Sequence, residues 1–84
     1  MANQLNESLI SSLIENNAKV LDIGCGTGDL LYYLEKIKNI NGQGIEISQK
    51  GVQESVSKGL SVIQGDADID LVNFPDNAFD VVIL

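Results

Sequence analysis

Three glycines at alternating positions, Gly24, Gly26 and Gly28, constrain the fold of this 84-residue chain more than any other feature. They follow a short apolar run at residues 18–23, which is typical of a buried strand. Asp29 then opens a segment with helical apolar spacing, and an acid suits the positive end of a helix. A glycine turn between a strand and a helix lets the backbone approach a ligand closely. The sequence therefore predicts a ligand site at the start of an α/β fold.

The rest of the chain continues the alternation of helices and strands. We expect a helix over 5–14, a second helix that begins at residue 29 and a third over 49–58. Strands are expected over 18–23, 43–47, 60–63 and 79–84, with a loop at 39–42 and a turn at 74–77. The buried faces of the three helices are predicted to contain Leu5, Leu9, Ile10, Leu13 and Ile14, then Leu30, Leu31, Leu34 and Ile37, then Val52 and Val56. Ser48 is a good N-cap for the third helix, and Gly59 is its expected C-cap. Such alternation implies parallel strands with right-handed crossovers.

The charge of the chain excludes several classes of function. The formal net charge is −7, from 12 acidic and 5 basic side chains, and there is no His. Nucleic acids and anionic membranes attract basic proteins, so we expect neither as a partner. Without His, the commonest metal ligand and general base are missing; we predict no metal site and assign no catalytic residue. No signal peptide and no membrane span are apparent, so we expect a cytoplasmic protein.

The spacing of the turn distinguishes between ligands. Dinucleotide-binding turns have the pattern G-x-G-x-x-G, whereas this turn is G-x-G-x-G with Asp22 two residues before it. We interpret the turn as a site for a ligand with a carboxylate and an ammonium group, where Asp22 meets the ammonium. The alternative is a glycine turn without a ligand. Cys25 has no base to activate it and has acidic neighbours, which raise a thiol pKa, so we interpret it as a small loop residue.

Acidic residues follow the next two strands. Glu46 lies near the end of the second strand, where an acid accepts hydrogen bonds from ribose hydroxyls. Ile47 is a candidate to pack on an adenine face, with plain core packing as the alternative. Asp66 is placed to accept from an adenine amine, and the Ala67 amide to donate to the ring; an Asx-turn is the alternative for Asp66. Asp68 and Asp70 are interpreted as solvated loop acids.

The motifs resemble those of class I S-adenosylmethionine-dependent methyltransferases, and more narrowly the MetW methionine biosynthesis proteins. The resemblance rests on the runs at 20–31, 44–47, 62–68 and 74–83, of which the last two are the most specific. It implies a Rossmann-like fold with parallel strands in the order 3-2-1-4 and S-adenosylmethionine as the cofactor. The implied cofactor-binding residues are Asp22, Gly24, Cys25, Gly26, Gly28, Glu46, Ile47, Asp66 and Ala67.

The resemblance leaves two functions open. One is a small-molecule methyltransferase, and the other is a non-catalytic partner or regulatory subunit of homoserine O-acyltransferase. The glycine spacing disfavours a third, a dinucleotide-dependent oxidoreductase. The match covers only the first half of such a domain, so we expect residues 1–84 to be the N-terminal part of one S-adenosylmethionine-binding domain. Otherwise the apolar edge at 81–84 is expected to pair with another chain, as in a homodimer.

Overall fold

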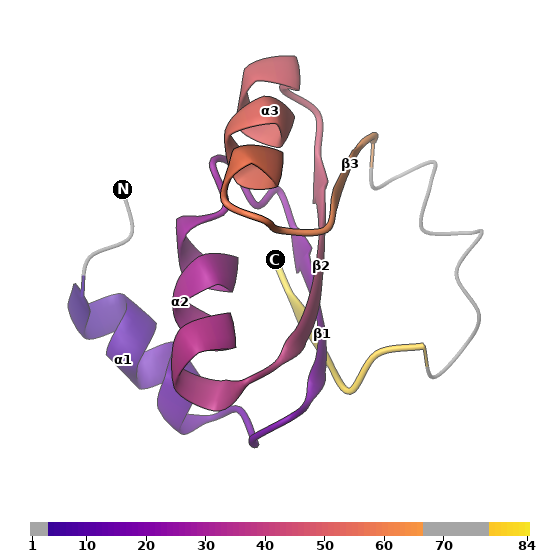
Figure 1. The fold of residues 1–84 in the computed structure, drawn as a ribbon. Helices are drawn as coiled ribbons and strands as arrows, with labels where there is room; N and C mark the ends of the chain where they lie inside the picture. The colour runs from indigo at the N-terminus through magenta and orange to yellow at the C-terminus, as the bar shows by residue number, and fades with distance from the viewer. Residues whose placement is uncertain (1–3, 67–77) are drawn as a thin grey trace.

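The computed structural model describes residues 4–66 and 78–84. Its elements, in chain order, are α1 (Gln4–Ser12), β1 (Lys19–Ile23), α2 (Asp29–Lys38), β2 (Asn41–Glu46), α3 (Gln49–Ser57), β3 (Val62–Gln64) and β4 (Val81–Ile83). The strands form one parallel sheet in the order β3-β2-β1-β4, which confirms the predicted fold class. Figure 1 shows the sheet nearly edge-on, with all three helices on the same side.

The strand register brings the carboxyl ends of three strands to one edge. Ile23 of β1 pairs with Ile45 of β2, and Glu46 of β2 pairs with Gln64 of β3. The segments that follow β1, β2 and β3 therefore lie side by side at this edge. The glycine turn after β1, the start of α3 after β2 and Asp66 after β3 all lie there.

The core lies between the sheet and the helices. Its buried residues are Ile14, Ala18, Val20, Leu31, Leu34, Ile40, Leu60 and Val62. Val20, Leu31 and Leu34 have no exposed surface, so β1 and α2 form its centre. Burial of such side chains stabilises the fold by about 1.5–3 kcal/mol each relative to exposure.

Four apolar residues that were predicted to be buried are exposed. Leu9 and Leu13 are 62% and 78% exposed, because only one side of the first helical segment packs, through Ile10 and Ile14. That helix also ends at Ser12 and not at residue 14. The predicted apolar stripe was therefore too wide.

The other two exposed residues show where α2 and α3 face the sheet. Ile37 is 55% exposed because it lies about 90° around α2 from the face that Leu31 and Leu34 bury. Val56 is 53% exposed because α3 buries Gly51 and Ser55, one turn apart, against the sheet edge. The small residues, and not the valines, mark the centre of the packed face of α3.

Seven of the eight predicted strand ends shift by one or two residues. β2 begins at Asn41, within the predicted loop, because Asn41 and Gly42 already pair with β1. β3 begins at Val62 rather than at residue 60, and β4 covers only Val81–Ile83. The predicted turn at 74–77 lies outside the described residues.

The predicted start of α3 is confirmed, and its end lies one residue before the predicted one. The Ser48 hydroxyl accepts a hydrogen bond from the Gly51 N–H at 3.2 Å, as an N-cap should. At the other end the cap is Lys58, and Gly59 follows with a left-handed φ of 85°.

Candidate functional site

The turn after β1 has a backbone that only glycine adopts easily. Gly24, Gly26 and Gly28 have φ values of 73°, 60° and 85°, in the left-handed region. The Gly24 N–H donates to the Ile45 carbonyl at 2.8 Å, so the turn is fixed to the end of β2. Gly28 caps α2 without a side-chain hydrogen bond. The alternating glycines of the sequence are thus required by alternating positive φ angles.

Glu46 connects the turn to α3. Its side chain is only 9% exposed. Oε1 accepts from the Gly26 N–H at 2.8 Å, and Oε2 accepts from the Ser48 N–H at 2.9 Å. Each carboxylate oxygen has further lone-pair capacity, so these bonds leave room for additional donors such as hydroxyls. Glu46 therefore organises the edge of the sheet in addition to its predicted role toward a ribose.

Asp22 lies beneath the turn and is 5% exposed. Burial, and then the negative charge of Glu46, raise the pKa of Asp22 from 3.8 to about 6. A cation beside Asp22 would oppose both effects, because it favours the charged carboxylate. The environment of Asp22 thus suits a positively charged group of a ligand.

Cys25 does not have the environment of a nucleophile. Burial, together with the charges of Asp22 and Glu46, raises the pKa of its thiol above the ordinary value. Its side chain packs against the core cluster. The interpretation of Cys25 as a small structural residue of the turn is consistent with this position.

Two hollows open on either side of Gly24. The first, of about 200 Å³, is lined by Ile23, Gly24, Ile45, Glu46, Ile47, Gly65 and Asp66. The second, of about 450 Å³, is lined by Ile10, Asp22, Ile23, Gly24, Cys25, Gly26, Thr27, Asp29, Leu30, Ile83 and Leu84. The structure describes eight of the nine predicted site residues, and seven of these line one or both hollows; Gly28 lines neither, and Ala67 lies outside the described residues.

The first hollow brings together the acid at the end of β2 and the acid that follows β3. Glu46 and Asp66 both line it, as the predicted nucleoside site requires. Ile47 is 69% exposed, which removes core packing as an explanation for this residue and leaves its side chain available at the rim. The roles of these residues toward a ribose and an adenine stay predictions.

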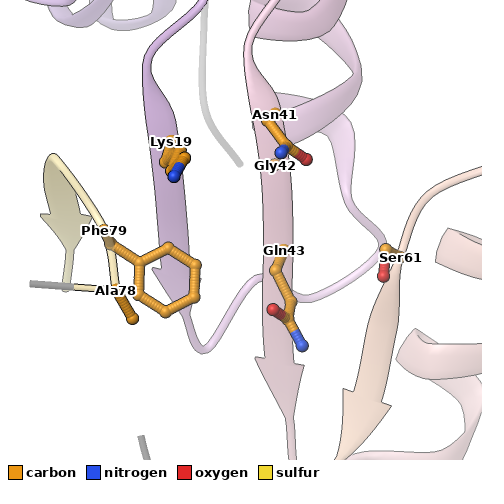
Figure 2. Close-up of a pocket in the computed structure, with 7 residues that line it drawn as sticks. All are labelled: Lys19, Asn41, Gly42, Gln43, Ser61, Ala78 and Phe79. Carbon is orange, nitrogen blue, oxygen red and sulfur yellow. The ribbon is translucent and has the colours of Figure 1, made fainter. Parts of the chain in front are cut away.

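Another hollow, of about 360 Å³, lies at the opposite ends of the strands. Figure 2 shows Lys19 and Phe79 on one side of it and Gln43 and Ser61 on the other, near the start of β1 and β2. Among the residues that the structure describes, no predicted site residue and no acid lines it. We therefore place the candidate site at the carboxyl ends of the strands.

Neither a metal site nor a membrane helix is found in the part of the chain that the structure describes. Residues 4–66 and 78–84 contain no group of three His, Cys, Asp or Glu side chains that could hold a metal ion. Within the same ranges, no helix is long and apolar enough to cross a bilayer. Asp68 and Asp70 lie outside the described residues.

The sequence analysis missed the contribution of α3 to the site. The Ser55 hydroxyl donates to the Gly26 carbonyl at 3.1 Å, and Lys58 Nζ donates to the Thr27 carbonyl at 2.7 Å. The one available signal was the pair of small residues Gly51 and Ser55, four apart on a helix, which permits close backbone approach.

Comparison with known proteins identifies relatives of the whole chain. The family model described as "Methionine biosynthesis protein MetW" matches residues 5–84. A bifunctional methionine biosynthesis protein MetXA/MetW from Rhodopirellula baltica is 32% identical over 88 residues, which cover 95% of this chain and 14% of that protein. This chain therefore spans only a small part of the length of that curated relative.

Solved structures show the same fold. A SAM-dependent methyltransferase from Thiobacillus denitrificans, in complex with S-adenosyl-L-homocysteine, has a TM-score of 0.79 at 24% identity, covering 95% of this chain and 35% of that one. The [4+2]-cyclase SpnF has a TM-score of 0.77 at 27% identity, covering 90% of this chain and 31% of that one. Since one of these proteins is named as a methyltransferase and the other as a cyclase, the fold alone does not fix the reaction.

Proposed function

This chain belongs to the MetW family of methionine biosynthesis proteins, and on that premise we propose that it binds S-adenosylmethionine at the glycine turn. The observation that carries the proposal is the pair of acid-lined hollows on either side of Gly24. S-adenosylmethionine has two polar ends of different chemistry, a nucleoside and an amino acid. Two adjoining hollows with different linings suit such a ligand.

The hollow lined by Glu46, Ile47 and Asp66 suits the nucleoside. The Glu46 carboxylate can accept from both ribose hydroxyls, and Asp66 from the adenine amine. Ile47 offers apolar surface at the rim for one face of the adenine ring. The Ala67 amide is the proposed donor to the ring.

The hollow lined by Asp22 suits the amino acid end. Asp22 is buried beside the negative charge of Glu46, which raises its pKa, and the ammonium group of the ligand would supply an opposite charge. Gly24, Cys25 and Gly26 line the same hollow and let the ligand approach the backbone closely. Gly28, behind them, provides the left-handed step into α2.

A protein that binds S-adenosylmethionine could have either of two roles, and we favour that of a methyltransferase. Methyl transfer depends mainly on alignment of the acceptor with the sulfonium group, so it needs no His and no metal. The second candidate is a regulatory subunit of homoserine O-acyltransferase. The relative named as bifunctional MetXA/MetW supports it, because MetW there shares one chain with a second methionine biosynthesis protein.

Equilibrium dialysis of the full-length protein tests the ligand. We expect retention of S-adenosylmethionine and S-adenosylhomocysteine and no retention of NAD, because the turn lacks the dinucleotide spacing. Retention of NAD alone would contradict the proposal. The two roles are then separated by two assays: transfer of labelled methyl to metabolites, and homoserine O-acyltransferase activity with and without this protein.

A further inference from the structure

The hollow at the opposite ends of the strands, which we call the Lys19 hollow, lies on the face of the sheet opposite the helices (Figure 2). A Cβ at Gly42 would lie 3.1 Å from Leu31 of α2, so the side-chain position of Gly42 faces the helices. Side chains alternate along a strand, so those of Asn41 and Gln43 point to the other face. Lys19 is the register partner of Asn41 and points the same way. Three polar side chains thus gather over the start of β1 and β2.

The peptide groups of Gly42 form an unpaired edge beside this hollow. The Asn41 N–H donates to the Ala18 carbonyl on the β1 side at 2.8 Å, so the groups of Gly42, one residue on, point to the β3 side. There β3 begins only at Val62, opposite Gly44. Gly42 is buried, yet neither its N–H nor its carbonyl has a hydrogen-bond partner among the described residues. Buried peptide groups nearly always have a partner, so another molecule is expected at this edge.

The size of the Lys19 hollow exceeds what a single water needs. Gly42 and Ser61, on the two sides of the unpaired edge, both line it. Its volume is about 360 Å³, whereas one water needs about 10–15 Å³. Pockets for small molecules begin at about 300 Å³. The hollow therefore has the dimensions of a small-molecule site.

Lys19 brings a positive charge to the hollow. Its backbone is fixed by Asp80, because its N–H donates to Asp80 Oδ2 at 2.8 Å and its carbonyl accepts from the Asp80 N–H at 2.8 Å. Its Nζ forms no ion pair with any acid in the part of the chain that the structure describes, although the chain has a net charge of −7. The side-chain amides of Asn41 and Gln43 also lack a hydrogen-bond partner within residues 4–66 and 78–84. A carboxylate is the ligand group that such an ammonium binds best.

We propose that the Lys19 hollow is a second binding site, for a free α-amino acid with an apolar side chain. The carboxylate of the amino acid accepts from Lys19 Nζ and from the Gly42 N–H. Its ammonium donates to the Gly42 carbonyl and to the amide oxygen of Gln43. The apolar side chain lies against the Phe79 ring, which Figure 2 shows beside Lys19.

A zwitterion uses the hollow more completely than a simple ion does. A carboxylate without an ammonium would leave the carbonyl of Gly42 and the amide oxygen of Gln43 unpaired. An amine without a carboxylate would leave the Lys19 ammonium and the Gly42 N–H unpaired. The inference does not rest on the proposed function, because no residue that lines the Lys19 hollow lines the two hollows at the glycine turn.

The test is a titration of the isotope-labelled full-length protein, followed by two-dimensional NMR of its amide signals. The probes are L-leucine, L-methionine and L-phenylalanine, together with isocaproate and isoamylamine, which are leucine without its ammonium and without its carboxylate. One arm contains saturating S-adenosylhomocysteine, so binding at the glycine turn is measured separately. We expect at least one amino acid to shift the signals of Gly42 and Ser61 in a saturable manner in both arms, and both analogues to bind at least about tenfold more weakly.

Two variants and a matched control connect the binding to the hollow. Lys19→Met removes the ammonium and keeps an apolar stem, and Gln43→Glu keeps the size of the side chain but repels a carboxylate. Each should weaken the amino acid by at least about tenfold, the size expected for one charge-assisted contact. Lys50→Met removes the same charge from an exposed position of α3 that does not line the hollow, so it should leave the affinity unchanged. Either variant alone decides the point if the other does not fold.

The outcomes that overturn the inference are distinct. No saturable shift at Gly42 and Ser61 with any of the three amino acids would leave water as the occupant of the hollow. Equal affinity for isocaproate or isoamylamine would show an adventitious ion only. Loss of the shifts in the arm with S-adenosylhomocysteine would place the amino acid at the glycine turn. An equal loss of affinity in Lys50→Met would show an effect of net charge and not of the hollow.

Discussion

The Glu46 carboxylate and the Gly26 N–H, 20 residues apart in the chain, form a 2.8 Å hydrogen bond that closes the glycine turn onto the end of β2. The other oxygen of the same carboxylate accepts from Ser48 at the start of α3. One side chain thus fixes the turn and the next helix relative to each other. The site is built as much by this bond as by the glycines.

Replacement of Glu46 by Gln tests that bond. Glu46→Gln keeps the shape of the side chain but replaces one acceptor oxygen by an NH₂ group, so one of the two N–H donors loses its partner. We expect the free energy of unfolding to fall by about 1–3 kcal/mol, measured by urea denaturation. An unchanged denaturation midpoint would contradict the structural role of Glu46.

The raised pKa of Asp22 makes stability depend on pH. The folded-state pKa of about 6 lies above the ordinary value of 3.8, so folding favours the protonated carboxyl. The stability that protonation contributes is fully present below pH 3.8 and is lost as the pH rises through 6. Asp22→Asn does not titrate, so we expect it to be more stable than the wild type at pH 8, by a margin that shrinks toward pH 4.5. Urea denaturation of both proteins across this range measures the margin, and a constant margin would count against the prediction.

The pH dependence of ligand affinity should also come from Asp22, but affinity should rise with pH where stability falls. Asp22 must be ionised to meet an ammonium, so the affinity for S-adenosylhomocysteine should fall as the pH drops below 6. Binding near pH 5.5 should also release protons, because the ligand lowers the pKa of Asp22. Calorimetry in buffers with different ionisation enthalpies measures this release. Asp22→Asn should bind more weakly and release fewer protons.

The N-cap of α3 is the fourth feature that can be tested. Ser48→Ala removes the acceptor for the Gly51 N–H and should lower the free energy of unfolding by about 1 kcal/mol. Ser57→Ala, at the exposed end of the same helix, should change it by less than about 0.5 kcal/mol. Equal effects of the two variants in thermal denaturation would mean that the cap contributes nothing.

The fold was predictable where periodicity and turn chemistry agree. The glycine turn followed from alternating glycines between a strand and a helix, and the end of α3 from Gly59. The start of β2 was missed because Asn41 and Gly42 have low strand propensity, yet their backbone pairs with β1. Pairing with a neighbouring strand depends on tertiary structure, which local pattern does not contain.

The gathering of the predicted site residues at one end of the sheet was predictable, but the hydrogen-bond network that supports them was not. Asp22 and Glu46 lie near the carboxyl ends of β1 and β2, Asp66 follows β3, and parallel strands bring these ends together. The support from Ser55 and Lys58 was not visible, because a polar residue on a helix normally indicates a solvent-facing position. Only the contact between α3 and the turn shows that the buried face of this helix is partly polar.

Calorimetric titration of S-adenosylhomocysteine into the full-length protein, alongside Gly26→Val and Glu46→Ala, tests the central claim most directly. Gly26 has a φ of 60°, which a β-branched residue adopts only with strain, so Gly26→Val should abolish binding. Glu46→Ala should weaken it, because the proposed ribose acceptor and the bond to the turn are lost together. The predicted result is that the wild-type protein binds most tightly, Glu46→Ala more weakly and Gly26→Val not at all. No binding by the folded wild-type protein, or equal binding by all three proteins, would contradict the assignment of the glycine turn as the ligand site.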